Sequence, residues 1–195
     1  MGRITATFAS SNPGKLRELR ALLSGWEIEP FTGALPEETG STFYENARLK
    51  VTAAHEDGRW TLGEDSGLEV DGLDGAPGIR SARYAGSNAT DEENVRELLE
   101  ALAGAEGDAR RARYVSELVC LTPVGSEVRG RGTLEGSIGH EPRGSEGFGY
   151  DPVFVPRGEA RTVAELGDVW KREHSHRAEA ARALRAALGD EAAGL

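Results

Sequence analysis

The sequence predicts an α/β fold in which a curved β-sheet is flanked by helices. Three observations predict it: helical patterns stand near both ends of the chain, strand-like segments lie between them, and several strand candidates follow one another in the middle. This order is typical of an α/β or an α+β protein. The length of 195 residues suits one domain, so we expect a single domain over residues 1–195.

The chain is expected to begin with a strand, a tight loop and a helix. Residues 3–9 alternate apolar and polar side chains, which is the period of a strand with one buried face. Asn12 and Pro13 then stand where the N-cap and the first residue of a helix are expected. Leucines recur at helical spacing after them, as far as Gly25.

Capping signals predict where two further helices begin. Thr42 with Glu45, and Thr90 with Glu93, have the spacing of a capping box. A last apolar stripe ends at Gly189, a residue type that often follows a helix. We therefore expect helices over residues 42–55, 90–104 and 175–189.

Strand candidates lie between these helices, and they cover residues 60–63, 68–70, 114–122, 127–134 and 153–155. Residues 125–149 are too rich in Gly, Ser and Glu for a core helix. We expect this stretch to form a hairpin followed by a functional loop.

Composition narrows the class of protein. The formal net charge of -10 argues against general binding of nucleic acid backbones, which requires clustered Lys and Arg. Cys120 is the only cysteine, so a disulfide framework and a Cys-based zinc site are excluded, and we expect Cys120 to lie buried in a strand. Neither a membrane-spanning run nor an apolar leader is evident, so we expect a cytoplasmic protein without membrane contact.

The segment SSNPGK, residues 10–15, is a candidate site for an anion or a phosphate. Helix N-terminal amides gather there, Gly14 permits close approach, and Lys15 adds a cation. It lacks the spacing of a Walker loop. In the alternative interpretation, Asn12 simply caps the helix and Lys15 is solvated.

The segment GEDSG, residues 63–67, offers adjacent carboxylates after a strand candidate. Successive residues of an extended chain face opposite ways, so we expect only one carboxylate to point into a site. Asp65 with a second carboxylate would suit Mg²⁺, and Glu37, Glu38 and Glu45 are the candidates for that second ligand. A turn without chemistry is the alternative.

Two segments in the last third of the chain offer a flat ring and several donors. In GFGYDP, Phe148 is flanked by glycines and can stack on a base, while Asp151 can accept hydrogen bonds. Lys171, His176 and Arg177 are donors that we expect at the start of the last helix. The alternatives are a core position for Phe148 and a solvated basic first turn.

Taken in order, the segments SSNPGK, EETGSTFYENARLK, GEDSGLEVDGLDGAPGIRSARYAG, GFGYDPVF and SHRAEA resemble the Ham1-like inosine triphosphate pyrophosphatase family. The resemblance spans nearly the whole chain. It implies an elongated two-lobed α/β domain with a central curved mixed sheet, a nucleotide cleft between the lobes, a homodimer, and Mg²⁺ as cofactor. It also implies hydrolysis of noncanonical purine nucleoside triphosphates, ITP, dITP and XTP, to the nucleoside monophosphate and pyrophosphate.

The resemblance also implies roles for individual residues. Glu38 and Asp65 would bind the metal, and Asp65 would also be the base that activates water. The residues implied to bind substrate are Ser10, Ser11, Asn12, Pro13, Gly14, Lys15, Lys50, Ser66, Phe148, Gly149, Tyr150, Asp151, Lys171, His176 and Arg177. A nucleotide sensor without turnover, or a related pyrophosphatase for modified pyrimidine nucleotides, is the alternative function.

Overall fold

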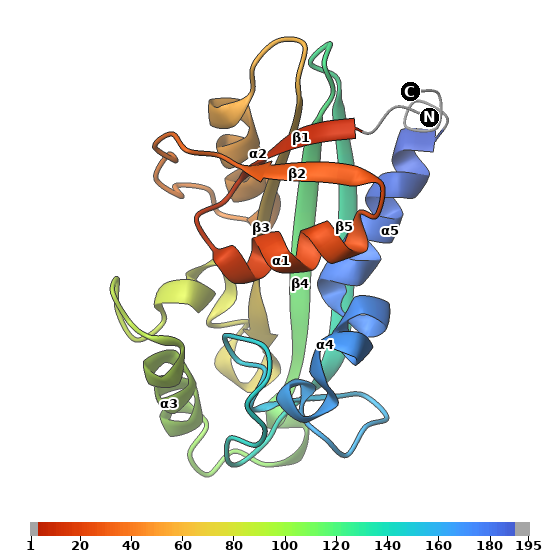
Figure 1. Cartoon of the computed structure of the whole chain (residues 1–195). Coiled ribbons are helices and arrows are strands. Elements are labelled where there is room, and N and C mark those ends of the chain that lie inside the picture. Colours follow the sequence, from red (N-terminus) through yellow and green to blue (C-terminus); the bar gives the residue numbers. More distant parts are fainter. Residues whose placement is uncertain (1–3, 190–195) are drawn as a thin grey trace. The chain divides into compact units, whose positions relative to one another are not determined.

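The computed structural model describes residues 4–189 and contains one mixed sheet flanked by helices (Figure 1). The strands are β1 (Ile4–Ala9), β2 (Trp26–Pro30), β3 (Trp60–Val70), β4 (Arg111–Leu121), β5 (Glu127–Ile138) and β6 (Phe154–Pro156). The helices are α1 (Pro13–Leu22), α2 (Phe43–Ala54), α3 (Asp91–Ala101), α4 (Val163–His174) and α5 (His176–Leu188), with short 3-10 turns at Asp71–Leu73, Gly78–Arg83 and Gly107–Arg110.

Within residues 4–189 the sheet has six strands in the order β2-β1-β3-β4-β5-β6. β1 pairs in parallel with both β2 and β3, whereas β5 and β6 are antiparallel, so the sheet is mixed and the predicted α/β class is confirmed. In the β1–β3 register Ala9 lies opposite Gly63. The chain that leaves β1 therefore emerges beside the two residues that follow Gly63 on β3.

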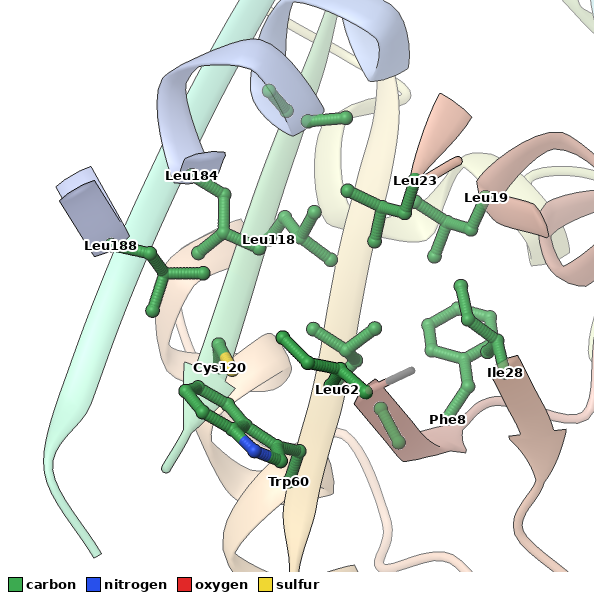
Figure 2. Packing of buried hydrophobic residues seen from close by; sticks show 14 residues of the cluster. Phe8, Leu19, Leu23, Ile28, Trp60, Leu62, Leu118, Cys120, Leu184 and Leu188 are labelled. Carbon is green, nitrogen blue, oxygen red and sulfur yellow. The ribbon is translucent and has the colours of Figure 1, made fainter. Parts of the chain in front are cut away.

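The described residues divide into two compact units, and the first comprises residues 4–65, 116–132 and 176–189. Its main core packs α1 and α5 against the sheet through Phe8, Leu62 and Leu184 (Figure 2). A smaller cluster of Ala47, Val51 and Val119 joins α2 to β4. Helices thus cover the centre of this part of the sheet on both faces, which is why the residues that β3 and β4 contribute to the unit are nearly continuously buried.

The second unit comprises Ser66–Val115 and Thr133–Ser175 and has a hydrophobic core of its own. Leu98 of α3, Phe154 of β6 and Val153 are fully buried in that core. Tyr114 stacks on Phe154 with ring centroids 4.6 Å apart.

The expected helices form, and their caps are the ones that the sequence indicated. Thr42 and Thr90 each accept a hydrogen bond from the amide three residues on, and the Glu at that position closes the capping box. The strand expected from residue 3 begins at Ile4, since Arg3 lies outside the described residues. In the described range no helix is long and apolar enough to cross a membrane.

One expectation about the elements is wrong, and two elements were not expected. The segments 60–63 and 68–70 form one strand, β3, because buried cations and hydroxyls satisfy the polar residues between them and no turn is needed. β2 was not expected, because only Ile28 of this edge strand is buried. α4 was not expected either, because Gly167 has φ 79° and interrupts its helical pattern.

Candidate active site

The loop between β1 and α1 is built around the side chain of Asn12. Its Oδ1 accepts hydrogen bonds from the amides of Gly14 (2.8 Å) and Lys15 (3.1 Å), so it caps α1 as the alternative interpretation expected. The Ser10 hydroxyl accepts from the amide of Asn12 at 3.2 Å. These amides are therefore bound within the loop, and the charge that the loop offers to an anion comes from Lys15.

Lys15 is not solvated as that alternative supposed. Its side chain is 14% exposed, and its Nζ lies 3.1 Å from Oε2 of Glu64. Glu64 is fully buried on β3, where Oε1 also accepts hydrogen bonds from Ser116 (2.9 Å) and from Nη2 of Arg177 (3.0 Å). The guanidinium of Arg177 is bound as well by Glu18 of α1.

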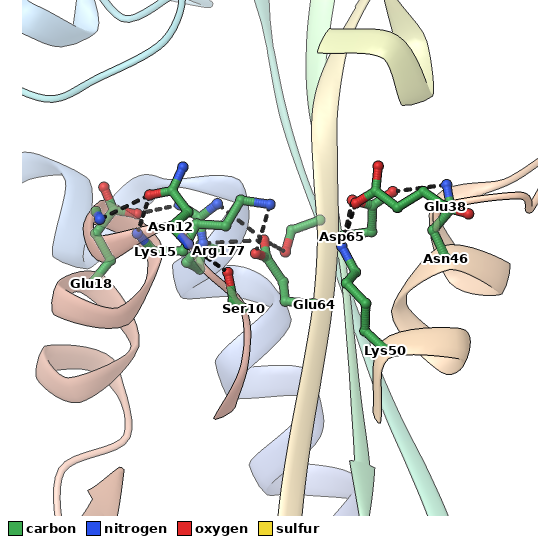
Figure 3. A network of polar contacts seen from close by, with 12 residues as sticks. Ser10, Asn12, Lys15, Glu18, Glu38, Asn46, Lys50, Glu64, Asp65 and Arg177 are labelled. Atoms are coloured by element: carbon green, nitrogen blue, oxygen red, sulfur yellow. Dashed lines mark hydrogen bonds and ion pairs between the residues drawn. The ribbon is translucent and has the colours of Figure 1, made fainter. Parts of the chain in front are cut away.

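Asp65 faces the opposite side of β3 from Glu64, as Figure 3 shows. Its Oδ1 lies 3.0 Å from Nζ of Lys50, and its Oδ2 accepts a hydrogen bond from Asn46 at 3.3 Å. The same Nζ lies 2.9 Å from Oε1 of Glu38. Two carboxylates thus share one ammonium group, and the expected division of the adjacent acids between two faces is confirmed.

The two adjacent carboxyl groups have pKa shifts of opposite sign. Burial would raise the pKa of Glu64, but the charges of Arg177 and Lys15 outweigh it and hold that pKa far below its usual range. Burial raises the pKa of Asp65, and the Glu38 carboxylate adds to this effect, against the opposing charges of Lys50 and Lys15. Neighbouring acids with separated pKa values are typical of sites that need one fixed charge and one proton acceptor.

Glu38 and Asp65 are the described carboxylates whose arrangement suits a hard divalent cation. Both present carboxylate oxygens to one common point, now taken by the ammonium of Lys50. Within residues 4–189 there is no group of three or more His, Cys, Asp or Glu side chains that could hold a metal alone. Mg²⁺ commonly uses one or two carboxylates together with phosphate oxygens and water, so this donor set suits it.

The other two candidate carboxylates are less suited. Glu45 is exposed and its Oε2 accepts hydrogen bonds from the amides of Ser41 and Thr42, where it closes the capping box of α2. No contact between Glu37 and either Lys50 or Asp65 appears among the contacts of the described residues.

In the second unit, Asp151 contacts two other predicted site residues, Lys171 and Phe148. Its Oδ2 lies 2.7 Å from Nζ of Lys171 and accepts the amide of Phe148 at 3.0 Å, while Oδ1 accepts from the hydroxyl of Tyr114. Nζ of Lys171 stands 4.7 Å from the centre of the Phe148 ring. A cation, a carboxylate and an aromatic face therefore lie together.

Several predicted residues have positions that the sequence did not indicate. Lys171 lies in the last turn of α4 instead of opening the last helix, which begins at His176. Tyr150 is buried and its hydroxyl donates to the carbonyl of Ser81, so its side chain belongs to the core. The amide of Gly149 donates to Asp91 of α3. Ser66 is half-buried on β3 immediately after Asp65.

Sequence reasoning missed the partners that complete these clusters, which are Glu18, Asn46, Tyr114 and Ser116. Only Asn46 left a clear signal. It stands four residues before Lys50 on the otherwise apolar buried face of α2, where a polar residue needs a partner. Glu18 and Ser116 have no such pattern, because their partners come from distant parts of the chain.

Comparisons with a family model and with individual proteins point to the same family. A model of the Ham1 family matches residues 6–187. A protein of Exiguobacterium sibiricum named dITP/XTP pyrophosphatase is 47% identical over 187 residues, which cover 92% of this chain and 94% of the relative. A protein of the same name from Gloeobacter violaceus is 50% identical over 183 residues, covering 90% of each chain.

Solved structures agree in fold. A HAM1 protein from Coxiella burnetii superposes with a TM-score of 0.81 at 40% identity, covering 92% of this chain and 95% of that one. The Ham1 protein of Staphylococcus aureus gives a TM-score of 0.84 at 37% identity, covering 96% of this chain and 99% of that one.

Proposed function

The chain belongs to the Ham1 family, and from this membership we propose that it hydrolyses noncanonical purine nucleoside triphosphates to the monophosphate and pyrophosphate. The substrates would be dITP and XTP, the two that the names of its relatives carry, together with ITP. The observation that carries the proposal is the pair of carboxylates, Glu38 and Asp65, around one buried cation. Asp65 lies on β3, which pairs with β1, the strand that leads into the loop of Lys15.

The first unit would bind the triphosphate. Lys15 at the start of α1 and Lys50 on α2 are cations with little exposure, and each can neutralise phosphate oxygens. Burial lowers the pKa of Lys50, but Asp65 and Glu38 more than offset this and raise it overall, so Lys50 remains charged at neutral pH. Ser10, Ser11 and Gly14 would contact phosphate oxygens from the loop.

Glu38 and Asp65 would hold the divalent cation, for which we propose Mg²⁺. When bound, this ion would supply charge neutralisation to the phosphate oxygens. Asp65 would orient a water molecule toward the α-phosphorus and accept its proton. We propose a reaction without a covalent intermediate, because no activated Ser or Cys with a base at hand is evident in the sequence, and Cys120 is buried.

The second unit would recognise the base. Phe148 offers a ring for stacking, and the ammonium of Lys171 is a donor held by Asp151. Hypoxanthine and xanthine carry an acceptor at position six, whereas adenine carries an amino donor there and would leave a buried donor unpaired. His176 and Arg177 at the start of α5 complete the proposed set of substrate contacts. We therefore expect dITP, ITP and XTP to be preferred over ATP.

We further propose that the protein is a cytoplasmic homodimer that binds neither nucleic acid nor membrane. The family resemblance supports the homodimer. The net charge of -10 supports the absence of nucleic acid binding.

The test is a product assay with Mg²⁺ across dITP, ITP, XTP, GTP, ATP and a modified pyrimidine triphosphate, with pyrophosphate and orthophosphate measured separately. We expect pyrophosphate from the first three. Tight binding of dITP without product would identify a sensor, and faster turnover of the pyrimidine would identify the related pyrophosphatase. Equal kcat/KM for ATP and ITP would contradict the proposed selectivity.

Asp65→Asn tests the assignment of the base. It keeps the size of the side chain and removes its ability to accept a proton, so we expect turnover of dITP to be nearly abolished with a folded protein. Glu69→Gln is a matched control, because this carboxylate lies on the same strand and pairs with Arg113. Near-normal turnover in Asp65→Asn, measured as pyrophosphate release, would contradict the assignment.

A further inference from the structure

We propose that Glu64 is a positioning residue for the triphosphate, which fixes Lys15 and Arg177 from the face of β3 opposite Asp65. The inference rests on the proposed function, because it assigns Lys15 to the phosphates. It gives a task to a buried carboxylate that neither the metal nor the proton transfer requires.

Glu64 is held by partners on both of its carboxylate oxygens (Figure 3). Its side chain is 0% exposed, and its two oxygens serve different partners. Oε2 lies 3.1 Å from Nζ of Lys15, while Oε1 accepts from Nε (3.1 Å) and Nη2 (3.0 Å) of Arg177. Ser116 donates to Oε1 as well, at 2.9 Å, and fixes the carboxylate from the neighbouring strand.

The cluster connects three elements that are far apart in the sequence. Lys15 and Glu18 belong to α1, Glu64 to β3 and Arg177 to the first turn of α5. Its two cations and two carboxylates balance, so burial leaves no net charge. Glu64 contacts both cations, and its loss would leave Arg177 with Glu18 and would release Lys15.

This arrangement would prepare Lys15 for a polyanion. A lysine side chain loses roughly 2 kcal/mol of rotamer free energy when it is fixed, and here that loss occurs before any ligand arrives. An ammonium group has three N–H donors, so Lys15 can keep its ion pair with Glu64 and still donate to phosphate oxygens. Without Glu64, Lys15 would become ordered only when phosphate binds, and this ordering would reduce the binding free energy.

A purely structural ion pair is the alternative, and a double-mutant cycle distinguishes it. The probe is inorganic tripolyphosphate, whose affinity is measured by calorimetry for the intact protein, Glu64→Gln, Lys15→Met and the double variant. We expect Glu64→Gln to weaken binding about 10-fold, the value of one charge-assisted contact. In the Lys15→Met background the same change should have almost no effect, because the side chain it positions is gone.

Glu117→Gln is the matched control. Glu117 lies on β4, is 5% exposed in its side chain and is bound by Arg129 at 2.6 Å. Like Glu64, it is a buried carboxylate paired with an arginine, but it has no role in the proposed binding of phosphate or metal. We expect it to lower the thermal midpoint and to leave tripolyphosphate affinity unchanged.

Equal losses from Glu64→Gln in both backgrounds, or an affinity that does not change, would overturn the inference. If Glu64→Gln does not fold, Glu64→Asp replaces it in the cycle, since it keeps the charge and withdraws it by one methylene group. The outcome is separate from that of the proposed function. A protein that binds tripolyphosphate through Lys15 and Glu64 but releases no pyrophosphate from dITP refutes the hydrolysis alone, and a Lys15→Met variant with full affinity refutes the proposed phosphate site.

Discussion

Adjacent residues on β3 reach different environments because an extended chain alternates its faces. Glu64 meets Arg177 and Lys15 and stays ionised, whereas Asp65 shares Lys50 with a second carboxylate. The alternation was predictable from the sequence alone. The identity of the partners was not, because Arg177 lies 113 residues from Glu64 in the sequence and no local pattern links them.

Cys120 carries a prediction about alkaline stability. Burial raises the pKa of its thiol from the ordinary 9.0 to about 12. Between these values the unfolded chain loses the proton while the folded protein keeps it, so the free energy of unfolding falls as pH rises, by up to about 1.4 kcal/mol per pH unit.

Urea unfolding at pH 8 and pH 10 measures this loss. In Cys120→Ala the protein is less stable at both values, but the part of the pH dependence due to the thiol disappears. An identical decrease between the two pH values in both proteins would contradict the buried, protonated thiol.

Among the helices and strands, local capping signals made some elements predictable, whereas a glycine within a helix concealed another. The capping boxes of α2 and α3 are local and were found from four residues each. β2 was missed because its signal depends on tertiary contacts, and α4 was missed although Thr162 and Glu165 form a capping box that is visible in the sequence. β2 is an edge strand held by β1, and α4 continues past Gly167 in spite of its non-helical conformation.

Gly132 of β5 carries a prediction about packing. A Cβ there would overlap the carbonyl oxygen of His176 and the amide nitrogen of Ala180, so α5 packs directly on the strand. We expect Gly132→Ala to lower the free energy of unfolding by about 1–3 kcal/mol, the usual cost of overpacking.

Gly139 supplies the control for this substitution. The nearest atom to a Cβ at Gly139 is 3.5 Å away, which is ordinary contact. Gly139→Ala should therefore cost little. Equal stability of the two variants in chemical denaturation would show that α5 does not approach β5 as closely as described.

At the scale of the whole molecule, composition and motif order predicted the class and the family. The α/β class, the mixed sheet and the Ham1 resemblance are confirmed. The resemblance implied a two-lobed domain, but the boundaries of the two compact units were not visible in the sequence, because β3, β4 and β5 each contribute residues to both. Long strands give no break in composition at which a boundary would appear.

The net charge gives a prediction about nucleic acid. At -10 the protein should repel a phosphate backbone, so fluorescence anisotropy with a labelled single-stranded RNA should show no binding at low or physiological salt. A basic RNA-binding protein serves as positive control. Binding that weakens as salt increases would contradict this expectation.

The most direct test of the account follows the oxygen of the attacking water. Hydrolysis of dITP in water enriched in heavy oxygen, followed by mass spectrometry of the products, should place the label in the nucleoside monophosphate, because the proposed attack is on the α-phosphorus. Label in pyrophosphate, or release of orthophosphate in its place, would contradict the proposed reaction.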